Sequence, residues 1–294
     1  MKTKAIAAIL ELYLADRILF KNLVEFSLLL TNRKQVVRLV GNVDLFMDLQ
    51  RLASVINFTI SKSPFMLETV RSTNLGDQFQ ISTEWNDSKD NDFVIYLGGE
   101  DAVLRAIEIE SGDCSAEDTA SVYGYPPCCA TNYQLISDGK NWIEALLGNS
   151  TELWYDYRAN KISSLFPPYL SLHQDYFPCS LDCVGSLEKC RSAEQSLKEC
   201  DLAEMLPHIK DHLSGIFVLY DQTLWFARKY LYDSVCTTFS DFHSTGFIDL
   251  SDRGRTPLPP YSIVLSGEQF SINFADGGTS SQNMKSGARL VIFH

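Results

Sequence analysis

The hydrophobic pattern of this chain changes near residue 214. Before that point, stretches such as NLVEFSLLL and DLFMDLQRLASVI repeat apolar side chains every three or four residues, which is typical of helices with one buried face. After it, short apolar runs such as GIFVLYD and YSIVLS indicate strands. The sequence therefore predicts an α+β fold, with a helical N-terminal and central part around a small sheet and a C-terminal antiparallel strand region.

The same change in pattern suggests how the chain is divided. Its 294 residues are enough for one large domain or two modest ones. We expect residues 1–213 to form a mainly helical domain that carries the cysteine segments described below. Residues 214–294 form a β-rich region, which is either a small second domain or part of the same domain.

Local signals predict individual elements. The residues from Ala5 to about Val70 have helical spacing, and Asn42 is suited to cap one of the helices. The run FVIYL predicts a strand, followed by a glycine turn and the helix EDAVLRAIEIE. Ser115 and Asp118 have the spacing of a capping box. Further helices are predicted at PPCCATNYQLI, at NWIEALLGN, and from Pro178 or Ser186 to Glu204.

Composition and charge restrict the classes of partner. Apolar residues make up 45% of the chain and charged residues 21%, as expected for a protein with a full core. The net charge is −12, and no basic run is longer than two residues. Binding to nucleic acid or to an anionic membrane requires clustered Lys and Arg, so neither partner is expected. A small molecule or a peptide is the expected kind of substrate if the protein is an enzyme.

The first twenty residues superficially resemble a signal peptide. Glu11, Asp16 and Arg17 interrupt the apolar stretch, and no small-residue cleavage site follows. No segment has the roughly 18 uninterrupted apolar residues of a membrane span. We therefore expect a cytoplasmic protein, in which the eight cysteines are free, metal-bound or catalytic rather than paired in disulfides.

Two pairs of cysteines suggest a metal site. Cys128 and Cys129 are adjacent, and 49 residues separate them from Cys179 and Cys183, which are four positions apart. Thiolates are soft anionic ligands that suit Zn²⁺ and iron–sulfur clusters. We therefore predict that these four cysteines bind an iron–sulfur cluster or zinc, although small buried cysteines that only fill a core are an equally good interpretation.

The positions of the prolines strengthen the metal hypothesis. Pro178 at the start of a helix would place Cys179 in the first turn, with Cys183 on the same face. The helix dipole and the free backbone amides of a first turn lower the pKa of a thiol. Cys128 and Cys129 follow two prolines in the same way.

A thiol enzyme without metal is the main alternative. In that case Cys179 is the nucleophile or redox thiol, Cys183 its resolving partner and His173 a base. Asp182 is a candidate general base or hydrogen-bond acceptor beside them. A non-catalytic interaction module, whose cysteines only pack, is a third hypothesis. Cys190 is an additional candidate ligand, and the remaining cysteines are interpreted as structural: Cys114, Cys200 and Cys236.

Aromatic residues are frequent near both cysteine segments. They suit a hydrophobic core, and they would also line an apolar pocket: Tyr123, Tyr125, Tyr133, Tyr169, Tyr176 and Phe177.

The stretch from Ile95 to Tyr133 resembles the DUF483-like proteins, an uncharacterised prokaryotic family. The family signature is a GYPxCC segment preceded by a strand, a turn and a helix, and here it reads Gly124-Tyr-Pro-Pro-Cys-Cys129. Pro127 stands where the family more usually has a polar residue. The later PCSLDCVGS looks like the family's second cysteine segment. Because the family has no established activity, the resemblance implies only that the two cysteine segments belong to one site.

Overall fold

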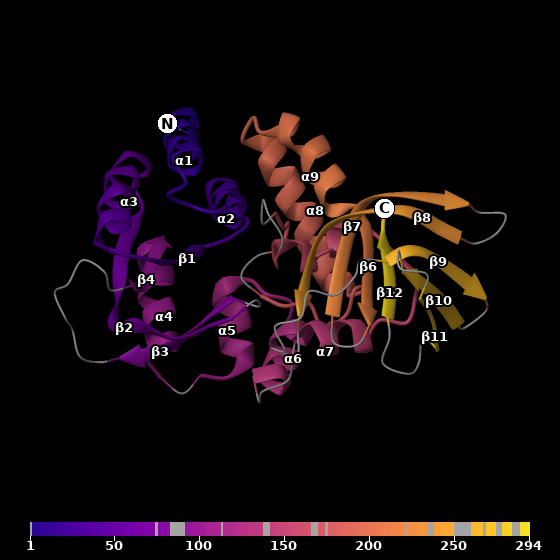
Figure 1. Ribbon diagram of the computed structural model, residues 1–294. Helices are drawn as coiled ribbons and strands as arrows, with labels where there is room; N and C mark the ends of the chain where they lie inside the picture. Colours follow the sequence, from indigo (N-terminus) through magenta and orange to yellow (C-terminus); the bar gives the residue numbers. More distant parts are fainter. Residues whose placement is uncertain are drawn as a thin grey trace.

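The protein has the predicted α+β architecture. The computed structural model describes residues 2–73, 76–82, 92–112, 114–137, 142–165, 170–173, 176–220, 223–233, 238–249, 260–266, 269–274, 278–283 and 289–294. Figure 1 shows two parts side by side, each built on one sheet: the elements up to α5 lie on one side, and the strands from β6 onward lie on the other. Among the described residues, no helix is both long enough and apolar enough to cross a bilayer.

The N-terminal part is a four-stranded antiparallel sheet between two groups of helices. The strand order is β1-β4-β2-β3. Its elements are α1 (Lys2–Leu14), α2 (Phe20–Leu30), β1 (Val36–Gly41), α3 (Val43–Ile56), β2 (Thr59–Thr73), β3 (Gly76–Ser82), β4 (Asp92–Gly98), α4 (Glu100–Ser111) and α5 (Ala116–Tyr123).

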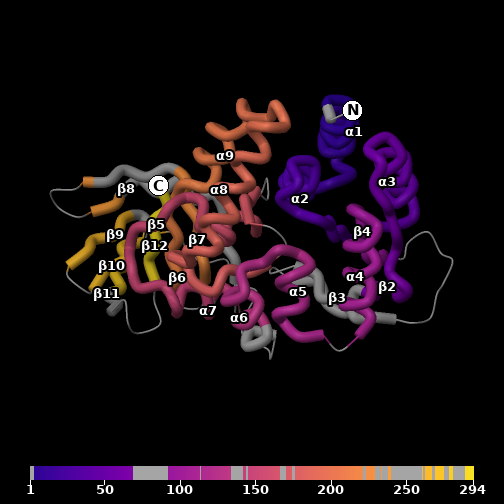
Figure 2. The backbone as a smooth tube through the Cα atoms, turned by 180° about the vertical axis from the view of Figure 1, so that it is seen from behind, coloured from indigo at the N-terminus to yellow at the C-terminus, as the bar shows by residue number. Residues whose placement is uncertain are grey.

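The rest of the chain builds an eight-stranded sheet with helices packed on it. The strand order is β11-β10-β9-β8-β7-β6-β12-β5, in which only the β12–β5 pair is parallel. The helices are α6 (Pro127–Ser137), α7 (Trp142–Gly148), α8 (Val184–Glu199) and α9 (Leu206–Leu213), with short 3-10 turns at Tyr157–Ala159, Ile162–Leu165 and Ala203–Met205. The strands are β5 (Trp154–Tyr155), β6 (Gly215–Tyr220), β7 (Thr223–Asp233), β8 (Thr238–Asp249), β9 (Pro260–Ser266), β10 (Gln269–Phe274), β11 (Thr279–Asn283) and β12 (Arg289–Phe293). Figure 2, from behind, shows α5 and α6 side by side where the two parts meet.

Strand β4 is buried on both faces, which explains its uninterrupted apolar run. Successive strand residues point to opposite faces. Phe93, Ile95 and Leu97 pack in the core formed with α1, α2 and α3. Val94 and Tyr96 pack on the other face, against α4 and α5. The strand predicted at FVIYL and the helix predicted after it are both confirmed.

The predicted caps are also present. The Asn42 side chain accepts a hydrogen bond from the backbone N–H of Leu45 at 3.1 Å, which starts α3. Ser115 and Asp118 form the capping box that starts α5.

The prediction of helical structure from Ala5 to about Val70 is wrong in two places. Residues of β1 and β2 lie inside that stretch and pair with β4. The run VVRLV of β1 is rich in β-branched residues, and its buried positions suit either a helix or a strand. Pairing with β4, which the local pattern does not contain, decides in favour of the strand.

One hydrophobic core crosses the expected boundary at residue 214. It contains residues of α8, such as Cys190 and Leu197, together with Phe217 of β6 and Phe293 of β12. The division into residues 1–213 and 214–294 stays a prediction.

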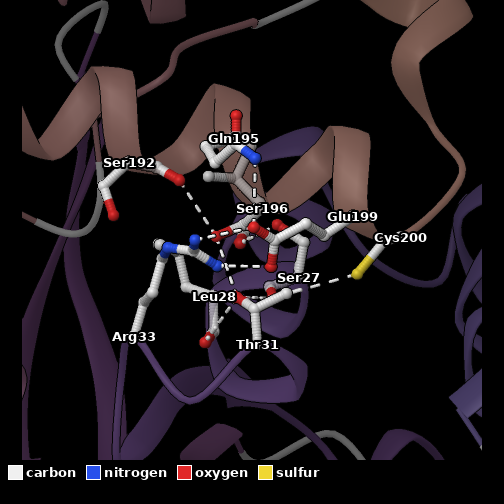
Figure 3. A network of polar contacts seen from close by, with 10 residues as sticks. Ser27, Leu28, Thr31, Arg33, Ser192, Gln195, Ser196, Glu199 and Cys200 are labelled. Carbon is white, nitrogen blue, oxygen red and sulfur yellow. Dashed lines mark hydrogen bonds and ion pairs between the residues drawn. The ribbon is translucent and has the colours of Figure 1, made fainter.

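Polar contacts join α2 to α8, as Figure 3 shows. Arg33, just after α2, donates two hydrogen bonds to the carboxylate of Glu199, at 2.7 and 2.8 Å. The Thr31 hydroxyl donates to Ser196 Oγ at 2.9 Å. These contacts connect the N-terminal part to the helix that follows the second cysteine segment.

A buried ion pair joins Lys34, which directly follows Arg33, to Glu25 of α2. The ammonium of Lys34 contacts the carboxylate of Glu25, and both side chains are only 2% exposed. Neither carboxylate oxygen of Glu25 has a hydrogen-bond partner among the described residues. The Lys34 charge therefore compensates the buried carboxylate.

We expect Lys34→Met to lower the free energy of unfolding by about 3–5 kcal/mol, because it leaves the Glu25 charge buried without compensation. The double variant Glu25→Leu/Lys34→Met should recover most of this loss. Urea unfolding of the wild type and the three variants measures the effect. A double variant as unstable as Lys34→Met would contradict this interpretation.

Candidate metal centre

The first cysteine segment is the beginning of α6. Gly124 ends α5 in the left-handed conformation, at φ 69°, which allows the chain to turn sharply toward α6. Pro127 is the first residue of α6, as predicted, because its fixed φ suits the first helical position. Cys128 and Cys129 therefore lie in the first turn of a helix.

The second segment has a different structure from the one predicted. Helix α8 begins at Val184, with Cys183 as its N-cap residue, so Cys179 lies in the loop before the helix and not in its first turn. The backbone N–H of Cys183 bonds to the carbonyl of Ser180 at 3.3 Å. Of the two predicted starts of this helix, Pro178 is wrong, since this tight turn precedes the helix, whereas Ser186 lies two residues after the observed start at Val184. Its end is also earlier than predicted, at Glu199 rather than Glu204.

Residues after α7 hold this loop in place. The side chain of Asn149 donates a hydrogen bond to the carbonyl of Cys179 at 2.9 Å. The hydroxyl of Ser150 accepts one from the backbone N–H of Leu181 at 3.2 Å. These contacts fix the orientation of Cys179 relative to the helix start.

A glycine allows the two segments to approach. A Cβ atom on Gly185 would lie 3.1 Å from the Cβ of Pro126. The first turn of α8 therefore packs directly on the residue that precedes α6. This close approach brings Cys183 to the start of α6.

The four cysteine sulfur atoms form one compact group, as the sequence predicted. All four lie within 4.8 Å of one another. The Cys183 sulfur is 3.6 Å from those of both Cys128 and Cys129, and the latter two are 4.0 Å apart. Cys129 and Cys183 are buried, Cys179 is half-buried and Cys128 is exposed. This group could hold a metal ion.

Tyrosine rings cover one side of the group. Tyr176 packs with Cys129 and Cys183, and its hydroxyl lies 2.9 Å from Ser186 Oγ. The Tyr125 ring lies 5.2 Å from the Tyr176 ring. The sulfur atoms therefore face an apolar surface on one side and solvent at Cys128.

In the metal-free group the sulfur atoms share protons unequally. Hydrogen bonds from the Cys129 and Cys183 thiols lower the pKa of Cys179 to about 4. The pKa of Cys129 is raised, first by its hydrogen bonds to Cys179 and Cys183 and then by burial. Cys179 is therefore the thiolate of the group, and the thiols of Cys129 and Cys183 donate hydrogen bonds to its sulfur atom.

His173 and Asp182, predicted as catalytic groups, lie around the sulfur group but outside it. The His173 ring is only 1% exposed and packs edge-on against Tyr176, with centroids 5.7 Å apart. Burial, and secondarily the charge of Lys161, lowers its pKa well below the usual value. Asp182 is exposed in the turn directly before Cys183. Their catalytic roles stay predictions.

The other cysteines lie apart from the four. Cys190 is fully buried, with a pKa raised mainly by burial, and is not part of the sulfur group. Cys200 is buried at the end of α8, and its sulfur lies 3.9 Å from the carbonyl of Ser27. Cys114 is half-buried. Cys236 lies outside the described residues.

A pocket of about 390 Å³ lies beside the sulfur group, and Cys129 forms part of its wall. Five of the six aromatic residues predicted to suit a pocket line it, and Tyr169 lies outside the described residues. Arg38 and Glu110 also line it, and sequence reasoning missed both. No local signal marks them, because the contact between β1 and α4 brings them together.

Comparison with protein-family models, with curated proteins and with solved structures found no match.

In the metal-free protein, we expect iodoacetamide to alkylate Cys179 at nearly the same rate at pH 6 and pH 8. Its lowered pKa keeps it a thiolate across this range, whereas an ordinary cysteine, with a pKa of about 8.5, slows by roughly tenfold per unit below that value. Peptide mapping by mass spectrometry identifies the labelled residue, and Cys179→Ser is the control. If every cysteine slowed tenfold per unit, the proposed sharing of protons would be wrong.

Replacement of the buried histidine should stabilise the protein. Neither ring nitrogen of His173 has a hydrogen-bond partner among the described residues, which costs about 1–3 kcal/mol for a buried polar group. His173→Phe should therefore raise the free energy of unfolding at pH 7 by about 1 kcal/mol.

The stability of the same variant should also depend less steeply on pH. Because the pKa of His173 is lower in the folded than in the unfolded protein, the unfolded state binds more protons below about pH 6.5, and stability falls as the pH falls. In His173→Phe the free energy of unfolding should decrease less between pH 7 and pH 5. Part of the decrease should remain, because His212 also has a lowered pKa, of about 4. Urea unfolding at each pH measures this. The exposed His208, changed to Phe, is the matched control for the substitution itself.

Proposed function

We propose that Cys128, Cys129, Cys179 and Cys183 bind one tetrahedral metal ion, and that this ion is zinc. The separations of the sulfur atoms carry the proposal. A tetrahedral ion with zinc–sulfur bonds of about 2.3 Å places its ligands about 3.8 Å apart. The three pairs among Cys128, Cys129 and Cys183 have sulfur–sulfur distances of 3.6, 3.6 and 4.0 Å, which lie just below and just above this value.

The same distances favour a single ion over an iron–sulfur cluster. Cysteines that bind different irons of a cluster lie farther apart than two ligands of one ion, because an iron–iron separation is added between them. Here all four sulfur atoms are within 4.8 Å. The adjacent pair, Cys128 and Cys129, is compatible with one ion because their sulfur atoms are 4.0 Å apart.

The charge around the group also supports metal binding. Four thiolates with one divalent ion carry a net charge of −2. Cys128 and Cys129 lie in the first turn of α6, and Cys183 is the N-cap of α8, so two helix N-termini meet the group. The positive ends of both helix dipoles stabilise negative charge there. Soft thiolate ligands in a tetrahedral arrangement favour zinc or iron over harder cations.

With four protein ligands the ion has no open coordination position, which is typical of a structural site. It closes the loop between Cys128 and Cys183, which are 55 residues apart, and holds α6 against the start of α8. Such a cross-link stabilises the folded state because it restricts the unfolded chain. The exposed Cys128 is the ligand that a substrate atom would replace if the ion were also catalytic.

A metal-free thiol enzyme is the second candidate. The half-buried Cys179 lies within 4.8 Å of Cys183, so the two are placed for disulfide exchange as nucleophile and resolving thiol. For either candidate, we also propose that the protein is cytoplasmic and belongs to the DUF483-like family. Its substrate, if it is an enzyme, would be a small molecule or a peptide. The meeting of the two cysteine segments supports the family assignment.

We expect protein purified without oxygen to contain one zinc per chain, with no acid-labile sulfide and no visible absorption. Cys129→Ser and Cys183→Ser should each lose most of the zinc, because both remove a buried ligand. Cys114→Ser, a cysteine outside the group, is the matched control and should keep it. Elemental analysis and sulfide determination measure the content.

Replacement of zinc by Co²⁺ tests the geometry. Tetrahedral thiolate coordination should give intense visible ligand-field bands and sulfur-to-cobalt charge transfer in the near ultraviolet. Iron with labile sulfide would overturn the single-ion proposal in favour of a cluster. If the protein contained no metal and its melting temperature responded neither to zinc nor to a chelator, the result would favour the thiol-enzyme hypothesis.

A further inference from the structure

One member of the sulfur group is open to solvent, and the other three are not equally accessible. Cys128 is exposed, Cys179 is half-buried, and Cys129 and Cys183 are buried. Around a zinc ion all four cysteines are thiolates, so their ionisation does not distinguish them. Exposure then decides which sulfur atom a reagent from solution meets first. That atom is the sulfur of Cys128.

A partner for an oxidised Cys128 is already in place. The Cys183 sulfur lies 3.6 Å from that of Cys128, whereas the Cys129 sulfur is 4.0 Å away. Cys129 is also the next residue in the chain, and adjacent Cα atoms are about 3.8 Å apart, below the usual disulfide range of about 4.4–6.8 Å. Successive side chains of a helix also point about 100° apart. Cys183 is therefore better placed than Cys129 to form a disulfide with Cys128.

The contacts that hold the two cysteine segments together do not use sulfur. Pro126 packs against Gly185 in the first turn of α8. The Asn149 side chain donates a hydrogen bond to the backbone carbonyl of Cys179, and the Ser150 hydroxyl accepts one from a backbone N–H of the same loop. A change in the oxidation state of the sulfur atoms therefore leaves this packing intact.

Charge favours a small neutral oxidant. The protein has a net charge of −12, and four thiolates around a divalent ion add a charge of −2. An anionic oxidant such as glutathione disulfide is repelled by this field, and its bulk hinders its approach to the helix start. Hydrogen peroxide is uncharged and small, so neither restriction applies to it.

We propose that Cys128 is a site of oxidation by hydrogen peroxide, and that the resulting Cys128–Cys183 disulfide releases the zinc ion while α6 stays joined to α8. The inference rests on the proposed zinc site and concerns the regulation of that site.

Two steps account for the atoms and the electrons. The Cys128 thiolate first attacks a peroxide oxygen: an S–O bond forms, the O–O bond breaks, and the departing hydroxide takes up a proton to become water. The Cys183 thiolate then attacks the sulfur of this sulfenic acid: the S–S bond forms, the S–O bond breaks, and a second hydroxide becomes water. The two sulfur atoms together lose two electrons, which the peroxide gains, and the zinc ion is neither oxidised nor reduced.

Release of the ion follows from the loss of two ligands. Disulfide sulfur atoms carry no negative charge, so only Cys129 and Cys179 remain, whereas a structural zinc ion needs four ligands. The connection between Cys128 and Cys183 stays closed throughout, first by the ion and then by the disulfide. A thiol reductant restores the four thiolates and with them the zinc site.

The first test adds hydrogen peroxide in molar excess to protein whose zinc content has been measured by elemental analysis. A chromogenic chelator follows the released zinc. We expect peroxide to release one zinc per chain, and glutathione disulfide at the same concentration to act about tenfold more slowly. A thiol reductant with added zinc should restore the original content.

Peptide mapping of the oxidised protein, without reduction, identifies the disulfide. The protease Asp-N cleaves before Asp182 and so separates Cys179 from Cys183. Fragmentation in the mass spectrometer between adjacent residues distinguishes Cys128 from Cys129. We expect the Cys128–Cys183 pair. The oxidised zinc-free protein should also melt about 5 °C above the reduced zinc-free protein, because the cross-link restricts the unfolded chain.

A variant that covers Cys128 without removing a ligand tests the role of exposure. Thr131 is exposed on α6, three residues after Cys128, and a helical side chain leans over the turn that precedes it. Thr131→Trp should keep its zinc and release it about tenfold more slowly in peroxide. Leu104→Trp, the same addition at an exposed position of α4, is the matched control and should behave as the wild type.

The outcomes separate this inference from the zinc site itself. Absence of zinc before oxidation would overturn the zinc site, and the inference with it. Zinc that is present but stays bound in excess peroxide would overturn the inference alone. A disulfide between any other pair, an oxidised protein that melts no higher than the reduced zinc-free protein, or release from zinc-loaded Thr131→Trp at the wild-type rate would do the same.

Discussion

Four sulfur atoms in mutual contact impose the strongest chemical constraint on this structure. Three of the sulfur atoms are 3.6–4.0 Å apart and all four lie within 4.8 Å of one another, so four thiolates would repel one another strongly and the group is stable either as protonated thiols or around a cation. Without metal, one negative charge placed on Cys179 is shared through thiol hydrogen bonds. With a divalent ion, all four sulfur atoms can be ionised at the same separations. The fold therefore presents a group whose geometry suits the metal-bound state with little rearrangement.

That geometry depends on the packing of two helix starts against each other. Pro126 lies against the first turn of α8 at Gly185, and contacts from Asn149 and Ser150 orient the loop in between. On the other side of α8, Arg33 and Thr31 connect the helix to the N-terminal part. Helix α8 therefore contacts both the sulfur group and the small sheet's helices, and its position determines whether the cysteine segments meet.

Much of this could be predicted where the cause is local. The cap at Asn42, the capping box at Ser115 and the proline at the start of α6 depend on neighbouring residues, and all three are present. The grouping of the two cysteine segments was predicted from the chemistry of thiols and from the family resemblance.

Features that depend on distant pairing were not found: β1 and β2 were read as helix because their partner β4 lies far along the chain. A helix start at Pro178 is wrong because a turn at Ser180 competes with the proline signal, and the helix begins at Val184, close to the alternative start at Ser186. Arg38 and Glu110 are 72 residues apart, and only the folded sheet makes them neighbours.

Cys129 belongs to two sites at once, and this has a thermodynamic consequence. Its sulfur is a member of the metal-binding group, and the residue also lines the aromatic pocket together with Tyr176. An ion that fixes the orientation of Cys129 also fixes part of the pocket wall, so it reduces the ordering cost of a ligand that binds there. Free energy is a state function, and whatever factor the ion adds to ligand affinity, the ligand must add to ion affinity. A closed four-cysteine site of the proposed kind, even without catalytic chemistry of its own, would therefore affect binding in the pocket beside it. The proposed ion and the pocket would in this way be coupled through Cys129 at one junction between the parts of the fold.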